Sequence, residues 1–287
     1  MTAPEPRKAK LHVLSPPPPK GFDPFAATKD DLKRYGLPRR PDRFKEPEMA
    51  ALWDRHARRY QRFEHLEPKV DDSSAAAARG VQPELGLSPF DSAGYTLFSN
   101  SGPFTALFIR WTVPHLVFVP EPLNINLFHT FVGLGFLDIH VEMTVDSAQN
   151  VTSVLSLSAI GQVTNLRIAP GDAMSASLCL NTNPAGTANY FVANETTGQT
   201  VNFTVDTGFP PAVTIDAGVT RDLVANNPTI SPLARFGVVY FDEISAFSTG
   251  GSQSLTAGQA VTMTDSNGST LASPVRLNDY AFKVVYG

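Results

Sequence analysis

The clearest alternation of polar and apolar positions lies between Thr130 and Val145, where the chain reads TFVGLGFLDIHVEMTV. Asp138, His140 and Glu142 alternate there with three apolar residues. Because successive side chains of a β-strand point to opposite faces, the pattern predicts a strand with one apolar face and one face carrying two carboxylates around an imidazole. Such a face is either a functional site or the solvated side of an antiparallel sheet, and this strand alone leaves both interpretations open.

From Phe90 onward, short runs rich in Val, Ile, Thr and Phe recur between clusters of Gly, Pro, Asn and Asp. Many short strands separated by turn residues predict an antiparallel β-sandwich or barrel. Two hairpin turns are predicted, at residues 265–268 (DSNG) and 194–198 (NETTG), because Asn and Gly tolerate positive φ. The predicted strands span residues 94–98, 104–113, 128–134, 137–145, 151–159, 163–168, 173–180, 187–194, 199–205, 212–219, 234–241, 260–264 and 280–286.

The first 70 residues show helical patterns instead. A short helix is predicted from Thr28 to Tyr35, since Thr28 and Asp31 match a capping box and Gly36 suits the position after a helix end. A second helix is predicted from Pro47 to Phe63, with the proline in its first turn. Its apolar and aromatic side chains form a stripe that needs a surface to pack on, so we expect this arm to dock. The stripe consists of Met49, Leu52, Trp53, His56, Tyr60 and Phe63.

The balance of basic and acidic residues also changes near residue 70. Residues 1–70 hold 16 Lys and Arg against 10 Asp and Glu, whereas residues 71–287 hold 7 against 17. A basic arm on an acidic body could bind nucleic acid, or it could lie against its own body or that of a neighbouring copy. We favour the second interpretation, because acidic residues are interspersed among the basic ones. No nucleic-acid partner is therefore predicted, and a homo-oligomer formed through the arm stays open.

Length and targeting signals narrow the class of protein further. With 287 residues, of which 42% are hydrophobic, the chain can form one large β domain. No run of about 18 apolar residues is present, so no membrane span is expected. No secretory signal is visible, which favours a cytoplasmic location over a secreted one. The single cysteine, Cys179, excludes an internal disulfide.

Motifs of several enzyme classes are absent from the sequence. It contains no GxSxG elbow, no P-loop, no GxGxxG ahead of a helix, no HExxH and no CxxC pair. His115, His129 and His140 lack the close spacing of zinc ligands, so neither a metal nor another cofactor is predicted. The aromatic residues are spread along the strands and are expected to build a core.

Taken in order, short motifs over residues 90–287 resemble the eqolisin, or glutamic peptidase, family. Its NWAGY, GTWTVP and WVGIDG segments resemble residues 91–95 (DSAGY), 110–114 (RWTVP) and 131–135 (FVGLG). Its ISAGD, TTGQ hairpin and LADFG segments resemble residues 168–172 (IAPGD), 194–199 (NETTGQ) and 233–237 (LARFG). The resemblance implies an all-β, concanavalin-like antiparallel β-sandwich with a concave groove that binds peptides.

The residues that carry the family's reaction are replaced. That reaction uses a Glu as general base on a water and a Gln that helps to stabilise the oxyanion. Matching the family's LQTGV to LDIHV puts Asp138 in the Gln place, and matching AEWIVE to AGVTRD puts Gly218 in the Glu place. Ser92 replaces the Trp of NWAGY, and the aromatic YEWYP segment has become VLSLSA at 154–159. An ionised Asp138 cannot donate to an oxyanion and Gly218 has no side chain, so the resemblance implies a pseudoenzyme.

The resemblance also divides the chain into a basic arm (1–68), a linker (69–90) and an eqolisin-like sandwich (91–287). The arm is similar to the leader of many bacterial relatives, where such a segment often covers the groove and is removed at low pH. With the catalytic pair missing, self-cleavage is not expected here. We predict a permanent arm docked on its own or a neighbouring body by Phe22, Phe25, Trp53 and Tyr60.

Three hypotheses about function stay open at this point. A degenerate family member could use the groove to bind a peptide, a small molecule or a partner, or serve in an assembly. Asp138, His140 and Glu142 could instead form a rebuilt acid–base site, because a neighbouring carboxylate orients an imidazole and raises its pKa. The chain could also be an active acid endopeptidase whose catalytic residues are misplaced by the alignment, with Glu142 and Gln162 as the nearest candidates.

Four further residues are candidates for ligand binding: Arg110, Trp111, Tyr95 and His129. Arg110 is expected on a strand next to the one that carries Asp138. There it would neutralise an anionic ligand, or form a charge network with Asp138 and Glu142 that simply satisfies a concave face.

Overall fold

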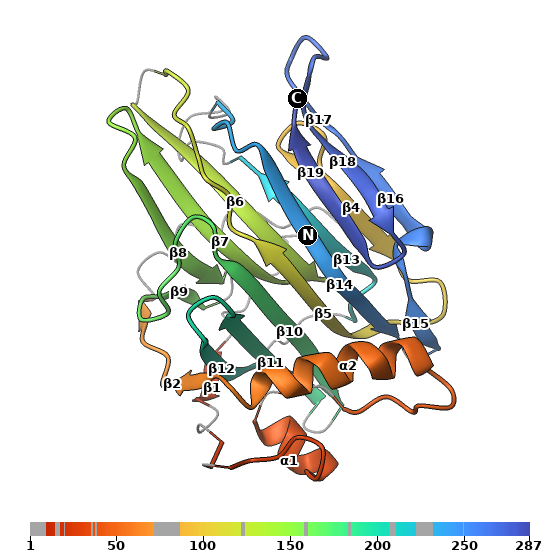
Figure 1. The fold of residues 1–287 in the computed structure, drawn as a ribbon. Helices are drawn as coiled ribbons and strands as arrows, with labels where there is room; N and C mark the ends of the chain where they lie inside the picture. Colours follow the sequence, from red (N-terminus) through yellow and green to blue (C-terminus); the bar gives the residue numbers. More distant parts are fainter. Residues whose placement is uncertain are drawn as a thin grey trace, which may run out of the picture.

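The computed structural model describes residues 10–14, 18–19, 21–35, 37, 39–71, 87–121, 124–157, 160–182, 185–206, 211–221, 232–248 and 250–287. Over these residues the chain forms two β-sheets packed face to face, with the helices against the outer side of one sheet (Figure 1). The predicted all-β sandwich is confirmed. Both predicted hairpin turns are present, with Gly198 and Gly268 at positive φ.

The larger sheet comprises β1 (Lys10–Leu14), β2 (Glu64–Leu66), β5 (Phe104–Thr112), β10 (Ala173–Thr182), β11 (Ala185–Asn194), β12 (Gln199–Asp206), β14 (Val238–Ser248), β15 (Gly251–Gln253), β17 (Met263–Thr264), β18 (Thr270–Asn278) and β19 (Ala281–Tyr286). Its order in the described chain is β1–β12–β11–β10–β5–β14–β19–β18–β17, with β15 beside β14 and β2 beside β12. Neighbouring strands are antiparallel, except that β2 runs parallel to β12.

The smaller sheet comprises β3 (Val70–Asp71), β4 (Ser92–Phe98), β6 (Ile125–Leu134), β7 (Leu137–Asp146), β8 (Val151–Leu157), β9 (Gly161–Val163), β13 (Thr214–Thr220) and β16 (Gly258–Val261). Its order is β16–β4–β13–β6–β7–β8–β9–β3. The inner faces of the two sheets form one hydrophobic core. This burial is what fixes the register of β7, because a shift by one residue would move its apolar side chains out of the core.

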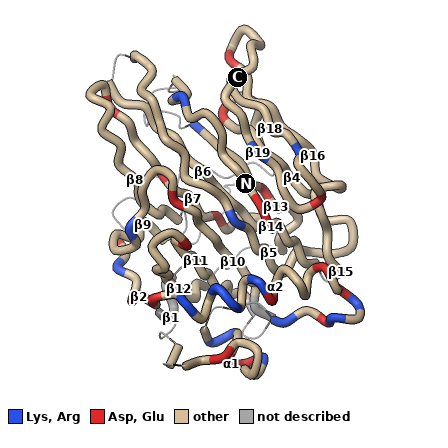
Figure 2. Tube along the Cα trace, viewed as in Figure 1, with Lys and Arg blue, Asp and Glu red and all other residues tan. Residues whose placement is uncertain are grey.

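Two helices precede most of the strands. In α1 (Lys29–Arg34), Thr28 and Asp31 form the predicted capping box, while Gly36 lies outside the described residues. The second helix, α2 (Pro47–Tyr60), ends three residues before the predicted Phe63. Figure 1 shows α2 lying across the strands of the larger sheet, and Figure 2 shows Lys and Arg residues gathered along it.

The stripe on α2 is buried against this chain's own body. Trp53 and Tyr60 pack with Phe191 and Ala193, which lie on the outer face of β11. Phe22 is also in contact, with its ring centroid 6.0 Å from that of Tyr60. The arm therefore covers the outer side of the larger sheet. A homo-oligomer joined through the arm stays a prediction, and the stripe does not need a neighbouring copy to cover it.

Several strands differ from the prediction. Residues of the predicted arm form β1 and β2 in the larger sheet, and the start of the predicted linker forms β3 in the smaller sheet. The division into arm, linker and sandwich stays a prediction. The predicted linker lies mostly outside the described residues, at 72–86. The strand predicted at 163–168 is shorter, since β9 ends at Val163, and the strand at 270–278 was not predicted. The described helices include none long and apolar enough to cross a membrane.

Candidate functional site

The polar face of β7 is the outer face of the smaller sheet. The apolar residues of β7 enter the core, whereas Asp138, His140 and Glu142 point outward and are partly exposed. His140 Nε2 lies 3.1 Å from Asp138 Oδ2, so these two predicted residues are in contact. Glu142 accepts a hydrogen bond from Gln162 Nε2 on β9 at 3.2 Å. A carboxylate against an imidazole fixes the orientation of the ring and can exchange a proton with it.

Aromatic side chains surround the imidazole of His140. Its ring stacks on Phe131, with centroids 5.8 Å apart and planes at 23°, and stands edge-on to His129 at 5.5 Å. Both neighbours are on β6, where Phe131 is in register with His140 and His129 with Glu142. Phe131 and His129 are buried although they point away from the core between the sheets. The structure thus brings the predicted binding residue His129 to the Asp138–His140 pair.

A further carboxylate lies on this face and was not predicted. Asp216 on β13 is in register with Gly133 on β6, and Gly133 is in register with Asp138 on β7. The Asp216 side chain is buried and accepts a hydrogen bond from Thr96 Oγ1 at 2.5 Å. Burial raises the pKa of Asp216 to about 6, although hydrogen bonds from Thr96 and Thr214 act in the opposite direction. A carboxyl group with this pKa is mostly protonated in mild acid.

The sequence contains a weak signal for this residue. Alternation along β13 (TIDAGVT) places Asp216 on the same face as Thr214 and Gly218, opposite the apolar positions. Only the strand order shows that β13 is two strands from β7, because nearly eighty positions separate Asp216 from Asp138 along the chain.

The position matched to the family's Glu is closed by neighbouring backbone. Gly218 on β13 is in register with Gly94 on β4. A Cβ on Gly218 would lie 2.2 Å from the carbonyl oxygen of Ala93, and one on Gly94 would lie 2.0 Å from that of Ala217. Both distances are far below van der Waals contact, so a side chain at either position requires the strands to move. Gly133 differs, because the nearest atom to an added Cβ would be 3.5 Å away.

Three of the predicted binding residues lie elsewhere. Tyr95 and Trp111 point inward and are buried in the core between the sheets, so they are not exposed to a ligand on the outer face. Arg110 is on β5 in the larger sheet, whereas the neighbours of β7 are β6 and β8. The expected placement of Arg110 beside Asp138 is therefore wrong, because the local sequence pattern does not show to which sheet a strand belongs.

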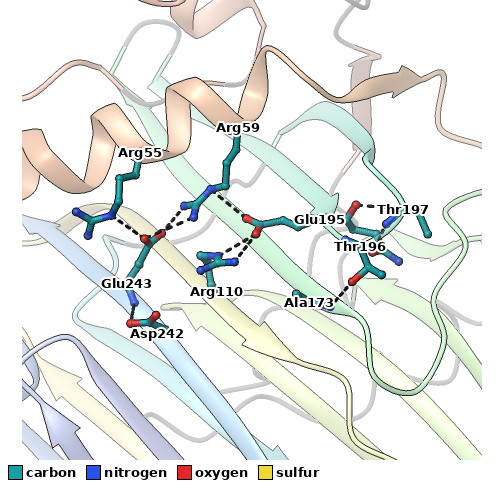
Figure 3. A network of polar contacts seen from close by, with 10 residues as sticks. Arg55, Arg59, Arg110, Ala173, Glu195, Thr196, Thr197, Asp242 and Glu243 are labelled. Carbon is teal, nitrogen blue, oxygen red and sulfur yellow. Dashed lines mark hydrogen bonds and ion pairs between the residues drawn. The ribbon is translucent and has the colours of Figure 1, made fainter.

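Arg110 instead belongs to an ion-pair network under α2, shown in Figure 3. Arg110 Nε and Arg59 Nε lie 3.0 Å and 3.4 Å from the two carboxylate oxygens of Glu195. Arg59 also pairs with Glu243, whose other oxygen lies 2.9 Å from Arg55 Nε. Burial alone would raise the pKa of Glu243, but hydrogen bonds from Arg59 and Arg55 outweigh it and the pKa is lowered. This network fastens α2 to the sheet.

A metal site and a cleft are the other candidates for a functional site. Among the described residues no group of three or more His, Cys, Asp and Glu side chains could hold a metal ion. A cleft of about 450 Å³ lies beside α2, over the larger sheet. It is lined by Leu52, Arg55, Asp242, Glu243, Asn278, Asp279 and Tyr280. Asp138 and His140 are on the other sheet, so this cleft is separate from their site.

Comparisons with known proteins agree with the fold. The model of the Peptidase A4 family matches residues 91–286. Scytalido-glutamic peptidase with a transition state analog inhibitor is similar in structure, with a TM-score of 0.56 and 15% sequence identity over 69% of this chain and 98% of that chain. SCP-B, a member of the eqolisin family in a complex with the tripeptide Ala-Ile-His, has a TM-score of 0.50 and 15% identity over the same shares. At this identity the likeness shows the fold. No curated protein sequence gives a significant match.

Proposed function

This chain belongs to the Peptidase A4 family, and we propose that it does not perform the glutamic-peptidase reaction. We also propose that it binds a peptide or small ligand on the outer face of its smaller sheet. One observation carries the first part of the proposal. The place matched to the family's Glu is held by Gly218, and backbone of β4 fills the space that a side chain would need. A general base therefore cannot be supplied from this position.

The second part rests on the groups that the same face presents. Asp138 and His140 are partly exposed there and offer a carboxylate and an imidazole, and the buried rings of Phe131 and His129 pack against the imidazole from behind. Ligand sites commonly combine aromatic walls with a few polar groups that fix orientation. The similar eqolisin structure holds a tripeptide, which makes a peptide the first ligand to test here.

An acid proteolysis assay tests whether the family's reaction is absent. Purified protein is incubated with denatured casein between pH 2.5 and 5, beside Asp138→Ala and Gly218→Glu variants. We expect no cleavage from any of the three, and a loss of stability in Gly218→Glu because the new side chain meets backbone. If the wild-type protein cleaves casein robustly and Asp138→Ala abolishes this cleavage, the proposal is contradicted.

A second candidate function is acid–base catalysis by a rebuilt site. The 3.1 Å contact between His140 Nε2 and Asp138 Oδ2 favours it, because a carboxylate-oriented imidazole is a common general base. Hydrolysis of a p-nitrophenyl ester at pH 7 provides a test. We expect Asp138→Ala and His140→Ala each to lower the rate at least tenfold, the usual contribution of a general base being larger still. A rate that both variants leave unchanged contradicts this candidate.

A further inference from the structure

The cleft of about 450 Å³ beside α2 is lined by three parts of the fold. The helix contributes Leu52 and Arg55, β14 contributes Asp242 and Glu243, and the hairpin of β18 and β19 contributes residues 278–280. This volume lies within the range of small-molecule sites, and the lining combines apolar, aromatic and charged side chains. The cleft is over the larger sheet, so a ligand here is independent of the one proposed for the smaller sheet.

A β-bulge brings two consecutive carboxylates to this cleft. Successive side chains of a regular strand point to opposite faces, yet Asp242 and Glu243 both line the cleft. The pairing of β14 with β5 shifts register between Asp242 and Ser245, and Glu243 has a φ of 53°, in the left-handed region. Bulges commonly redirect side chains beside functional sites. The backbone strain at Glu243 therefore coincides with the gathering of both carboxylates on one side of the strand.

Carboxylates without a cationic partner gather around Tyr280. The ion-pair network under α2, with Asp242 opposite Arg110 on the neighbouring strand, is balanced in charge (Figure 3). Asp279 and Glu48 lie outside this network, and in the described part of the chain neither forms an ion pair with a Lys or Arg. Asp279 lines the cleft, and Glu48 accepts a hydrogen bond from the Tyr280 hydroxyl. The balanced network comprises Arg55, Arg59, Arg110, Glu195, Glu243 and Asp242.

The surroundings of Tyr280 suit an organic cation. Its ring packs against the apolar cluster that includes Leu52. Burial, the hydrogen bond to Glu48 and the charges of Glu48 and Asp279 together raise the pKa of Tyr280 to about 12. Aromatic faces and carboxylates both attract organic cations. The cleft already accommodates one such group, because the guanidinium Nε of Arg55 lies 2.9 Å from the buried carboxylate of Glu243.

We propose that the cleft beside α2 binds a small alkylammonium ion, with Asp279 as its main counter-ion and with Tyr280 and Leu52 packing against its carbon chain. Asp242 lines the same cleft and offers a second acceptor, so a diamine fits better than a monoamine. The turn that carries Asp279 is fixed before a ligand arrives. Tyr280 N–H donates to Asn278 Oδ1 at 2.7 Å, and the Tyr280 carbonyl oxygen accepts from the backbone of β14 at 3.0 Å. Binding therefore needs little further ordering of the protein.

An NMR titration of the isotope-labelled full chain with 1,4-diaminobutane at pH 7 tests the proposal, with 1,4-butanediol as the uncharged probe of equal length. We expect the diamine, and not the diol, to shift the amide resonances of Asp279 and Tyr280. Asp279→Asn keeps the size of the side chain and removes its charge, so it should weaken binding about threefold or more. Asp30→Asn, at an exposed position on α1 outside the cleft, is the matched control and should bind as wild type. Added salt should weaken wild-type binding, because it screens exposed charges.

Variants of Tyr280 give a second readout. Tyr280→Phe keeps the ring and should still bind the diamine, whereas Tyr280→Leu removes the aromatic face and should weaken binding about twofold or more. Equal shifts with the diol, or an unchanged affinity in Asp279→Asn, overturn the proposal. Diamine shifts at Asp138 and His140 in place of the cleft residues also overturn it, while supporting a ligand site on the smaller sheet.

Discussion

The imidazole of His56 lies against the ring of Phe108, with the two ring centroids 4.3 Å apart. Phe191 stands edge-on to the same imidazole at 5.1 Å. His56 is buried on the side of α2 that faces the larger sheet, and neither of its ring nitrogens has a hydrogen-bond partner among the described residues. Burial, together with the nearby charges of Arg59 and Arg110, lowers the pKa of His56 to about 3. The arm therefore docks with this histidine neutral.

Acidification should lower the free energy of unfolding because of His56. Its folded pKa lies below the unfolded value, so the unfolded chain binds more protons below about pH 6.5 and stability falls as the pH drops toward 3. Between pH 7 and 4.5 the loss from this group is about 2–3 kcal/mol. Urea unfolding at both pH values should show that His56→Phe removes this part of the loss, whereas the exposed His115→Phe retains it. An equal loss in all three proteins contradicts the prediction.

Removal of Arg59 should destabilise the docked arm. Arg59 contacts two buried carboxylates, those of Glu195 and Glu243, and each would lose a partner. Each carboxylate keeps one partner, Arg110 or Arg55, and Arg59 retains some exposure. We therefore expect Arg59→Ala to lower the free energy of unfolding by about 1–3 kcal/mol. The neighbouring exposed Arg58→Ala should change it by less than about 0.5 kcal/mol. Denaturant unfolding compares the two variants. Equal stabilities would show that the network contributes little.

Three glycines of the smaller sheet, Gly94, Gly133 and Gly218, should respond differently to alanine. Gly94→Ala and Gly218→Ala place a methyl group within about 2 Å of backbone oxygen, so each should cost more than about 3 kcal/mol or prevent folding. Gly133→Ala meets only ordinary contacts and should stay within about 1 kcal/mol of wild type. Thermal melting of the three variants checks this order. A stable Gly218→Ala variant would reopen the family's Glu position as a site for a side chain.

Asp216 should make the protein more stable in mild acid than at neutral pH, relative to an Asn variant. Its folded pKa is raised to about 6 from 3.8, so the folded state holds the proton longer and stability falls as the pH rises through this window. The full effect is about 3 kcal/mol. Unfolding at pH 4 and 7 should show that Asp216→Asn abolishes this fall, while the exposed Asp279→Asn does not. If the Asp216→Asn and wild-type curves run parallel, Asp216 is not the group responsible.

Local sequence patterns predicted the elements whose formation depends on residues close together in the chain. The capping box of α1, the stripe of α2 and the alternation of β7 all come from spacing along the chain, and all are present. The strand at 270–278 was missed because Pro274 interrupts its pattern and much of it is exposed. Asp216 was missed because its neighbours across the sheet are distant in sequence.

The misplaced binding residues have a related cause. Strand alternation fixes which residues share a face but not whether that face meets the core or solvent. Tyr95 and Trp111 lie in motifs that resemble the family's. Their positions in the strand alternation nevertheless point both side chains into the core. The side chain of Arg110 does point outward, but it belongs to the larger sheet, where α2 covers it. Placing such residues requires the strand order, which non-local pairing determines.

A crystal structure at pH 5 with N-acetyl-Ala-Ile-Ala-amide tests most directly whether this family member binds peptides without cleaving them. We predict an intact peptide on the outer face of the smaller sheet, beside Asp138 and His140. Cleaved fragments on that face would contradict the loss of the family's reaction. A peptide bound instead in the cleft beside α2 would contradict the assignment of the site.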